Sequence, residues 1–460
     1  MAGTSPAMTP KVTRRAFANG LTATLVSLSR AARAQPQGVP PEGYRILEAR
    51  KAGLRLLPAP AQESPCFSYD GAAPGPLLRV RQGEDVRVRL VNRLDQPTTL
   101  HWQGLRGENA VDGVGNLTQK PVAPGASFDI SFKASDAGLY LYKPSLVPHG
   151  AEQIARGMSG VLIVDESDPP DVDRDLLVVM QDFALQPNGA FASFDASPPL
   201  EGRIGDHLTA NLAAAPLQET AAPGARLRLR LVNACAARIA VSTFEGAQPF
   251  CIAIDGQPCE PFNLVRNTAP LAPGARFDFF LDMPATEGAE VKLGLWSGQD
   301  RPLRPFLSIK AQGAPARAKG PIKPLPMNNR LPPEIRLGEA KKAELVIEPP
   351  KAAGKGWTIN GASMGYSAKP LFTIRRGTPV SFGFQNRSSV AISMHVHGFA
   401  MRLLHDLDDG WEPYWRNAVI VPKGVTKHVA LLADAPGRWA VCSDIADQEA
   451  NGLACWFEVV

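Results

Sequence analysis

One pattern recurs three times along the chain and limits the folds that it can adopt. Segments ending at Asn92, Asn233 and Asn386 alternate apolar with polar or charged residues: EDVRVRLVN, ARLRLRLVN and TPVSFGFQN. Alternation with a period of two is typical of a half-buried β-strand. About 30 to 40 residues after each asparagine comes a turn with proline and glycine and then another strand: APGASFDISF, APGARFDFFL and VPKGVTKHVALL. The regular intervals predict three copies of one β-domain.

Proline-rich segments separate the three repeats. ESDPPDVD at residues 166–173 lies between the first two, and a longer stretch at 318–334 lies between the last two. Helical periodicity is scarce, so we predict an all-β fold of three consecutive Greek-key β-sandwiches. The expected boundaries are 40–166 for the first sandwich, 174–313 for the second, 314–340 for a Pro-rich linker and 341–460 for the third.

The N-terminus has the pattern of an export signal. Arg14 and Arg15 precede a modest apolar run at residues 18–28, and the small residues of ARA end at Ala34. A basic start, a short apolar centre and a small-residue cleavage site define a signal peptide, and the paired arginines resemble a twin-arginine signal. The alternative is a short amphipathic helix. We expect residues 1–34 to be a twin-arginine signal peptide and the mature chain to be periplasmic.

The rest of the sequence indicates a protein without a membrane span. No later apolar run reaches the roughly 20 residues that a transmembrane helix needs. Residues 1–34 carry five of the 49 basic residues and no acidic one, so the mature chain would hold 44 basic and 44 acidic residues. This balance gives no reason to expect nucleic acid as a partner, and we expect a monomer.

Six cysteines would lie in an oxidising compartment after export. They allow many disulfide pairings, and the sequence selects none of them. Cys235, Cys251 and Cys259 all fall in the second repeat. In that repeat a disulfide is favoured over a metal site.

Two histidines occupy the same place in the first and third repeats. His101 and His395 each stand nine residues after the asparagine that ends the repeated strand. Their neighbours at i+2 are Gln103 and His397, and residues i and i+2 of a strand point to the same face. In the second repeat the equivalent positions hold serine and phenylalanine. Only the outer repeats therefore carry ligand-type residues here.

A second pair of positions repeats the comparison. GLYLYKPS in the first repeat places Lys143 and Ser145 where GRWAVCSD in the third places Cys442 and Asp444. Each pair again has i, i+2 spacing, so both side chains lie on one face of a strand. The first and third repeats thus contribute matching elements, which predicts one site shared between them.

Several motifs resemble those of the three-domain multicopper oxidases, the laccase-like proteins built from cupredoxin domains. The matches include PGPLLRVRQGEDV, DGVGNLTQKPVAPG, QIARGMSGVLIV, WTINGASM and MHVHGF, and they extend over essentially the whole mature length. The resemblance implies three cupredoxin-like domains. In this family copper is held by four motifs: HWHG, a later HxH, HPxHxHG, and HCH followed by a further histidine and an axial residue.

The resemblance implies that the type 1 copper has lost its ligands. The two histidine positions correspond to Ile392 and Gln448, the thiolate position to Ser443, and the axial position to Leu453. A type 1 centre needs a soft sulfur together with imidazoles. With neither present at these positions, we expect no type 1 centre.

One type 3 copper position would have Gln103, Lys143 and Asp444 as its ligands. An ammonium paired with a carboxylate and an amide can replace a bound cation without leaving an unpaired buried charge. We therefore hypothesise that Lys143 and Asp444 bridge the first and third domains where the family holds copper.

Other ligand-type residues remain. By the resemblance, His101 and His395 stand at the type 2 position, and His397, Ser145 and Cys442 at the second type 3 position. Three imidazoles and a thiol could bind one copper or zinc ion. The alternative is that these residues are hydrogen-bonded remnants of a lost site, in which case no cofactor is expected.

Two functions stay open. An exported chain of three cupredoxin domains with lost ligands resembles copper-free cell-division proteins of this superfamily. That resemblance implies a non-catalytic envelope scaffold with envelope or division proteins as partners. The alternative is an oxidoreductase or copper-binding protein that uses a residual site at His101, His395, His397 and Cys442. Reduction of O₂ to water needs several coppers and an electron entry site, so we do not expect a competent multicopper oxidase. If the chain is an enzyme, it is a copper-dependent oxidoreductase.

Overall fold

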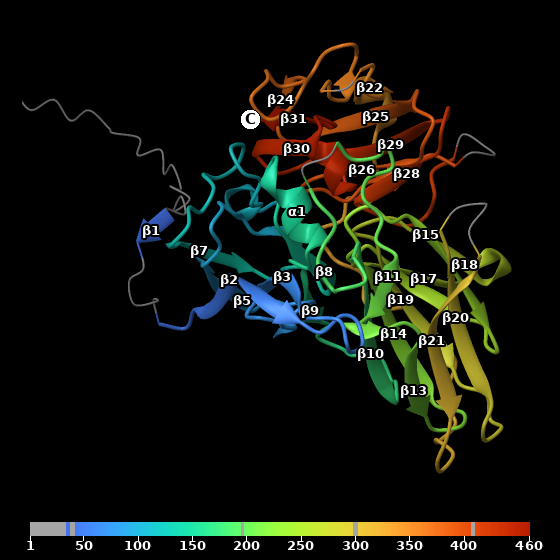
Figure 1. Cartoon of the computed structure of the whole chain (residues 1–460). Helices are drawn as coiled ribbons and strands as arrows, with labels where there is room; N and C mark the ends of the chain where they lie inside the picture. The colour runs from blue at the N-terminus through green and yellow to red at the C-terminus, as the bar shows by residue number, and fades with distance from the viewer. Residues whose placement is uncertain (1–33, 37–41, 195–196, 298–301, 353, 406–409) are drawn as a thin grey trace, which may run out of the picture. The chain divides into compact units, whose positions relative to one another are not determined.

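The computed structural model describes residues 34–36, 42–194, 197–297, 302–352, 354–405 and 410–460. Strands dominate these residues, and the helices among them are short (Figure 1). The helical elements are α1 (His149–Ala155), α2 (Ala446–Ala450), η1 (Asn109–Val111), η2 (Val265–Asn267) and η3 (Leu337–Glu339). The predicted all-β fold is confirmed. The predicted signal peptide at residues 1–34 lies outside the described residues, apart from Ala34.

The first sandwich combines a five-stranded and a four-stranded sheet. The larger sheet has the order β1 (Ala34–Pro36), β7 (Ala126–Lys133), β5 (Asp85–Asn92), β2 (Arg45–Leu54) and β3 (Ser64–Tyr69). The smaller has the order β4 (Leu78–Arg81), β9 (Gly160–Asp165), β8 (Gly138–Lys143) and β6 (His101–Gln103). Val86, Val88 and Leu90 of β5 enter one core with Trp102 of β6. The apolar half of the repeated pattern therefore faces the other sheet.

The second sandwich combines a seven-stranded and a five-stranded sheet. The larger sheet has the order β12 (Ala213–Ala214), β11 (His207–Ala210), β10 (Arg174–Phe183), β14 (Arg226–Asn233), β19 (Arg276–Asp282), β16 (Phe250–Ile254) and β17 (Gln257–Asn263). The smaller has the order β13 (Leu217–Ala221), β21 (Arg304–Ala311), β20 (Glu290–Trp296), β15 (Ala240–Glu245) and β18 (Thr268–Leu271). Leu227, Leu229 and Leu231 of β14 lie in the core between the sheets.

The third sandwich combines two five-stranded sheets. One has the order β23 (Thr358–Ile359), β22 (Lys341–Glu348), β25 (Thr378–Asn386), β29 (Thr426–Ala433) and β27 (Arg402–Leu403). The other has the order β24 (Thr373–Ile374), β31 (Ala454–Val459), β30 (Gly437–Ser443), β26 (Ile392–Val396) and β28 (Ala418–Val421). Val380, Phe382 and Phe384 of β25 enter the core. The strands β26 and β30 carry four of the candidate ligand positions, and two more, His397 and Asp444, directly follow these strands.

The asparagine at the end of each repeated strand anchors the turn that follows. Its amide donates to a main-chain carbonyl near the second strand, its side-chain oxygen accepts an N–H two residues on, and its carbonyl accepts the N–H of the turn glycine. In this order the partners are Val122, Leu94 and Gly125 for Asn92; Leu271, Cys235 and Gly274 for Asn233; Val421, Ser388 and Gly424 for Asn386. All three asparagines are fully buried, so this shared bonding explains why asparagine recurs.

The strand β14 departs from the expected half-buried pattern because both of its faces are covered. Its leucines enter the core of the second sandwich, while the side chains of Arg228 and Arg230 are only 2% and 1% exposed. The sheet that contains β14 packs against β8 and β9 of the first sandwich. Carboxylates, including Glu166 and Asp278, neutralise the arginines. The alternation therefore marks one apolar and one ionic buried face.

All six cysteines are buried and carry free thiols. The disulfide favoured in the second repeat is therefore not formed. Cys235 Sγ is directed at the carbonyl of Met180, at 3.8 Å, and Cys259 Sγ at the carbonyl of Cys251, at 3.9 Å. These thiols use main-chain oxygens as hydrogen-bond acceptors instead of bonding to one another.

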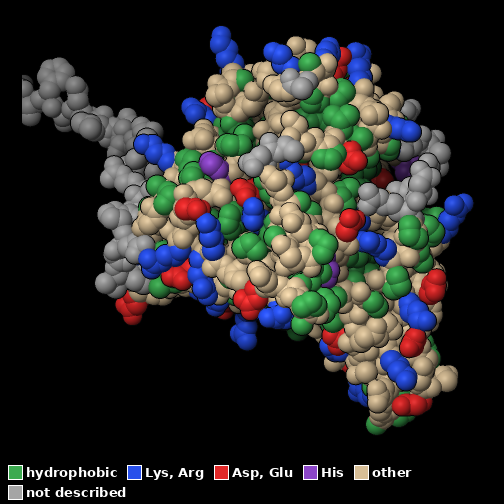
Figure 2. Space-filling model, viewed as in Figure 1, with side chains coloured by type: hydrophobic (Ala, Val, Ile, Leu, Met, Phe, Trp, Pro, Cys, Tyr) green, Lys and Arg blue, Asp and Glu red, His purple; other side chains and the backbone are tan. Residues whose placement is uncertain are grey.

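Acidic and basic side chains are interspersed on the face of the molecule that Figure 2 shows. Neither charge sign gathers into a single patch on that face. Among the residues that the structure describes, each helix is too short or too polar to cross a lipid bilayer.

Candidate metal centre

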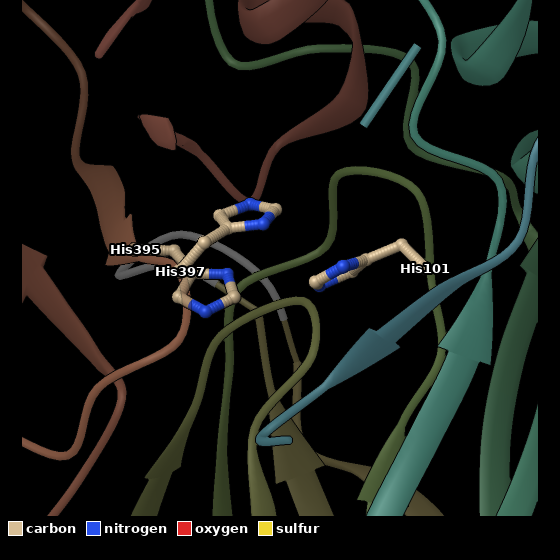
Figure 3. A group of neighbouring side chains, drawn as sticks. All are labelled: His101, His395 and His397. Carbon is tan, nitrogen blue, oxygen red and sulfur yellow. The ribbon is translucent and has the colours of Figure 1, made fainter. Parts of the chain in front are cut away.

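Three histidines from two sandwiches meet in the interior of the protein (Figure 3). His101 comes from β6 of the first sandwich, His395 from β26 of the third, and His397 directly follows β26. One ring nitrogen from each lies within 4.8 Å of the others, and each residue is only 2% exposed. The i, i+2 spacing directs His395 and His397 to one face. The site expected between the first and third repeats is therefore present as a cluster of imidazoles.

Asp112 orients two of the three rings. His101 Nδ1 lies 2.6 Å from the main-chain oxygen of Asp112, and His397 Nδ1 lies 3.1 Å from its carboxylate. Because both neighbours are acceptors, the Nδ1 atoms carry the protons and the Nε2 atoms keep their lone pairs. Burial alone would raise the pKa of Asp112, but His397 and His101 outweigh it and hold that pKa below its usual value. Asp112 therefore remains a carboxylate.

His101 Nε2 is buried and has no hydrogen-bond partner among the described residues. A buried polar atom without a partner is unfavourable, and such atoms often mark the place of a water or an ion. The lone pair of this nitrogen is available for coordination. This orphaned atom is the strongest indication that the cluster fits a metal ion.

Cys442 extends the cluster on the side of His397. Its Sγ lies 3.4 Å from His397 Nε2, the nitrogen that carries a lone pair, so the thiol S–H can donate to the imidazole. Burial raises the pKa of the Cys442 thiol well above its usual value. Beyond it, Tyr366 donates to Glu449 over 2.6 Å, and Ser145 Oγ donates to the same carboxylate oxygen over 3.4 Å.

Asp444 is the centre of a cross-brace between the first and third sandwiches. Its Oδ1 accepts from Gln103 Nε2 at 2.9 Å and lies 3.6 Å from Lys143 Nζ. The same oxygen lies 3.3 Å from His395 Nδ1, and Ser393 donates to Oδ2. Burial alone would raise the pKa of Asp444, but His395 and Lys143 lower it to about 2. The contact expected between Lys143 and Asp444 is present.

The second sandwich also reaches this brace. Arg276 is fully buried and donates to the carbonyls of Leu139 and Asp255, at 2.8 and 3.0 Å. Gly274 has a positive φ of 81°, and a Cβ at this position would lie only 2.1 Å from Gln103 Nε2. The Pro-Gly turn that precedes β19 in the second repeat therefore packs directly against the brace. Glycine is required at position 274 for space as well as for conformation.

The positions that the resemblance assigned to type 1 copper form a different cluster. Ser443 Oγ donates to Gln448 Oε1 at 2.8 Å, and Gln448 Nε2 donates to the carbonyl of Leu200 at 2.9 Å. Ile392 and Leu453 are fully buried in the apolar core of the third sandwich. These groups are a hydroxyl, an amide and two hydrocarbon chains, and the polar ones are bonded to protein. They do not fit a type 1 copper, which requires a thiolate and imidazoles.

The two candidate sites thus differ in their fit to a metal. At the imidazole cluster, the histidines and the Cys442 thiol offer a donor set suited to one copper or zinc ion. At the brace, the Lys143 ammonium occupies the surroundings of Asp444, and a second cation there would be repelled. Together the two sites therefore suit at most one metal ion, bound at the imidazole cluster.

Sequence reasoning did not find the roles of Asp112, Tyr366 and Arg276. The only signal for Asp112 was its place at the start of the DGVGNLTQKPVAPG motif. Gly113 follows it with a φ of 78°, and a Cβ there would lie 1.9 Å from the carbonyl of Leu100. A turn that only glycine fits therefore holds Asp112 beside the rings. For Tyr366 and Arg276 no local pattern existed.

The metal-free protein is expected to lose stability on acidification. Burial, together with His397, lowers the pKa of His395 to about 3, against an ordinary unfolded value near 6.5. Because the folded pKa is the lower one, the stabilisation is complete above about pH 6.5 and is lost as the pH falls toward 3. We expect the free energy of unfolding to fall by about 3 kcal/mol between pH 7 and pH 4 from this group alone. Urea denaturation at a series of pH values measures it.

Two variants control this pH dependence. In His395→Gln the slope between pH 7 and pH 4 is expected to be shallower, because the titrating group is gone. In His428→Gln, which changes a histidine on β29 with 37% of its side chain exposed, the wild-type slope is expected. Equal slopes in wild type and His395→Gln would show that His395 is not buried in its neutral form.

Comparison with known proteins gives a consistent result across the chain. Residues 55–169 and residues 340–460 match two family models, each described as multicopper oxidase. These two ranges correspond to the first and third sandwiches. They contain the imidazole cluster and the brace.

Relatives and solved structures extend the match to most of the chain. The crystal structure of a multi-copper oxidase from Pseudomonas thermotolerans is 31% identical, with a TM-score of 0.81, over 90% of this chain and 98% of that one. The multicopper oxidase MmcO of Mycobacterium tuberculosis is 25% identical over 87% of this chain and 85% of its own. The cell division protein FtsP of Proteus mirabilis is 28% identical over 61% of this chain and 62% of its own.

Proposed function

The chain belongs to the multicopper oxidase family, and from this premise we propose that it acts as a non-catalytic scaffold of the cell envelope. The observation that carries the proposal is the 3.6 Å contact between Lys143 Nζ and Asp444 Oδ1. Both residues stand at positions that the resemblance assigns to one type 3 copper. An ammonium group bonds no metal, and it lends its own charge to the buried carboxylate. The protein thereby keeps the joint between its first and third sandwiches without copper.

The electron entry site supports the same proposal. Oxidation of a substrate by this family starts at the type 1 copper, and the corresponding positions here hold Ile392, Ser443 and Gln448. The bond between Ser443 and Gln448 satisfies both polar side chains. No thiolate or imidazole stands at these positions to hold a redox metal.

The cellular setting is part of the proposal. FtsP, which is similar to this chain, is by its name a cell division protein. The N-terminal sequence favours export to the periplasm by the twin-arginine route. The partners would then be envelope or division proteins that the chain holds together.

The proposal predicts a protein whose role does not depend on metal. After incubation with copper or zinc and removal of free ions, the purified mature chain is expected to hold less than about a tenth of an ion per molecule. We expect no absorption band of the blue-copper type and no phenol oxidation. In cells that lack their own copy of the gene, the wild-type chain and the double variant His101→Ala/His395→Ala are expected to restore normal cell length equally. Loss of rescue in a double variant present at wild-type levels would contradict the scaffold role.

A second candidate function follows from the imidazole cluster. The orphaned His101 Nε2, the nearby nitrogens of His395 and His397, and the Cys442 thiol could hold one copper or zinc ion. A bound ion would supply Lewis acidity or, for copper, a one-electron couple. The chain would then be a metal-binding protein or a copper-dependent oxidoreductase.

The same metal measurement separates the two candidates. About one ion per chain, lost in His395→Ala and retained in His428→Ala, would establish the second candidate and reject the metal-free scaffold. His428 serves as the control because it lies on the partly exposed part of β29, paired with Glu344, away from the cluster.

A further inference from the structure

A cleft of about 430 Å³ lies between the second and third sandwiches. Its lining is mostly apolar and includes the aromatic rings of Phe262, Phe277 and Tyr414. The rings of Phe262 and Tyr414 are stacked, with centroids 5.3 Å apart. Glu412 and Arg416 also line the cleft, and their salt bridge neutralises both charges. None of the three histidines lines the cleft, and of the residues that form the brace only Ser393, which donates to Asp444, also lines it.

Two sheet edges border this cleft. β18 is the last strand of the five-stranded sheet in the second sandwich, and β28 is the last strand of its sheet in the third. Residues of both strands line the cleft. In Figure 1, β28 lies above the end of the second sandwich that carries β15 and β18. An edge strand has one row of main-chain groups that its own sheet does not use, and it can pair with an added strand.

The register of β28 shows which main-chain groups face the cleft. β28 pairs with β26 in antiparallel register, and Val396 N–H donates to the carbonyl of Asn417, its partner by the same register. In an antiparallel pair, hydrogen-bonded and non-hydrogen-bonded residues alternate. Val419 therefore bonds toward β26, whereas Ala418 and Ile420 direct their N–H and C=O groups away from it. No other described strand pairs with this row.

The opposite edge is less suited to pairing. β18 contains Pro270, which has no N–H to donate, and proline on an edge strand discourages the addition of another strand. The two edges therefore differ, and β28 is the one that offers donors and acceptors. The unpaired N–H and C=O groups of β28 belong to residues two apart in sequence, and the main-chain groups of an extended peptide repeat at the same spacing. A small molecule does not match this repeat, whereas a peptide strand does.

We propose that this cleft binds an extended peptide segment of a partner protein, which adds to the sheet as a strand along β28 and directs apolar side chains toward Phe262, Phe277 and Tyr414. This inference rests on the proposed scaffold function, because it supplies the surface by which such a scaffold holds a partner. Main-chain bonds to Ala418 and Ile420 provide the pairing, and the apolar lining selects the side chains.

The test is selection of peptides on the full-length mature protein. A phage-displayed library of random octapeptides is panned on the wild-type chain and, separately, on Ile420→Pro. Proline at position 420 removes the N–H that faces the cleft and leaves the bonds between β28 and β26 intact. We expect enriched peptides with alternating apolar residues. Their synthetic forms should bind Ile420→Pro about tenfold more weakly than wild type and Ile420→Val within about twofold.

A second measurement does not depend on the proline variant. Each selected peptide is also made with methyl groups on alternate main-chain nitrogens, which removes donors and keeps the side chains. Loss of binding by one of the two methylation patterns supports strand addition. Equal binding of both methylated forms, equal binding to a folded Ile420→Pro, or no enrichment over the bare support would overturn the proposal. If the peptides instead dissociate a dimer of this chain, the occupant is a second copy and the proposed partner is rejected. None of these outcomes alters the metal content or the cellular rescue that test the scaffold function.

Discussion

Replacement of Asp278 by alanine is expected to lower the free energy of unfolding by about 3 to 5 kcal/mol. Asp278 Oδ2 accepts from Arg228 at 2.7 Å and from Arg230 at 3.0 Å, and all three side chains are at most 2% exposed. Without this carboxylate, two buried guanidinium groups face each other with one partner fewer. The cost of an uncompensated buried charge is large because water cannot replace the lost partner. Urea denaturation followed by tryptophan fluorescence measures the change.

Asp282→Ala is the matched control. Asp282 lies on the same strand, β19, and also pairs with an arginine of β14: its two oxygens accept from Arg226 at 2.7 and 2.8 Å. Its side chain is 50% exposed. The Arg226 side chain is only 10% exposed, but it keeps its bond to the carbonyl of Gly320 and water can reach the place of the half-exposed carboxylate. We therefore expect a smaller loss, of about 1 to 2 kcal/mol. Similar losses in the two variants would show that burial does not determine the strength of this network.

The same network joins two sandwiches. Glu166, which follows β9 of the first sandwich, bonds Arg228 of the second at 2.7 Å, and Arg79 of the first lies 3.2 Å from Asp175 of the second. Asp175 in turn pairs with Arg230. The loss expected in Asp278→Ala therefore weakens the contact between the sandwiches as well as the sheet.

The fold could be predicted from the sequence because the sequence signals for it are local. Alternation along the three repeated strands fixes which side chains enter a core, and the asparagine after each strand forms the same bonds in every copy. Both depend on residues close in sequence or on one strand. The burial of the arginines of β14 did not follow, because it depends on a second layer that comes from another sandwich.

Part of the candidate site could also be predicted from the sequence, because its signals are local. The spacing of His101 and Gln103 on one strand, and of His395 and His397 at the end of another, gave their common direction. The role of Asp112 did not follow, since His397 is 285 residues away and only the packed fold brings the two together. The open row of β28 also lies beyond sequence reasoning, because which groups face outward depends on strand order and register.

A double-mutant cycle on Lys143 and Asp444 is expected to show that the brace depends on charge. Asp444→Asn retains an oxygen that can accept from Gln103 but leaves the Lys143 ammonium, 11% exposed, without its carboxylate. We expect a loss of about 3 kcal/mol in the free energy of unfolding. Adding Lys143→Met removes the unpaired charge and fills its space with an apolar chain. The double variant should therefore be more stable than Asp444→Asn alone, with a coupling energy of about 2 kcal/mol.

The size of that coupling energy decides between two physical pictures of the site. If the ammonium replaces a metal charge, the effects of the two substitutions are not additive, because each one alone leaves a buried charge of one sign. If Lys143 instead extends its amine to solvent, the two effects add within about 0.5 kcal/mol and Asp444 depends on its other partners, His395, Gln103 and Ser393. Lys143→Arg separates charge from shape: a planar guanidinium in a space fitted to an ammonium is expected to restore the charge but not the full stability. Full recovery in Lys143→Arg would show that the brace requires only a positive charge.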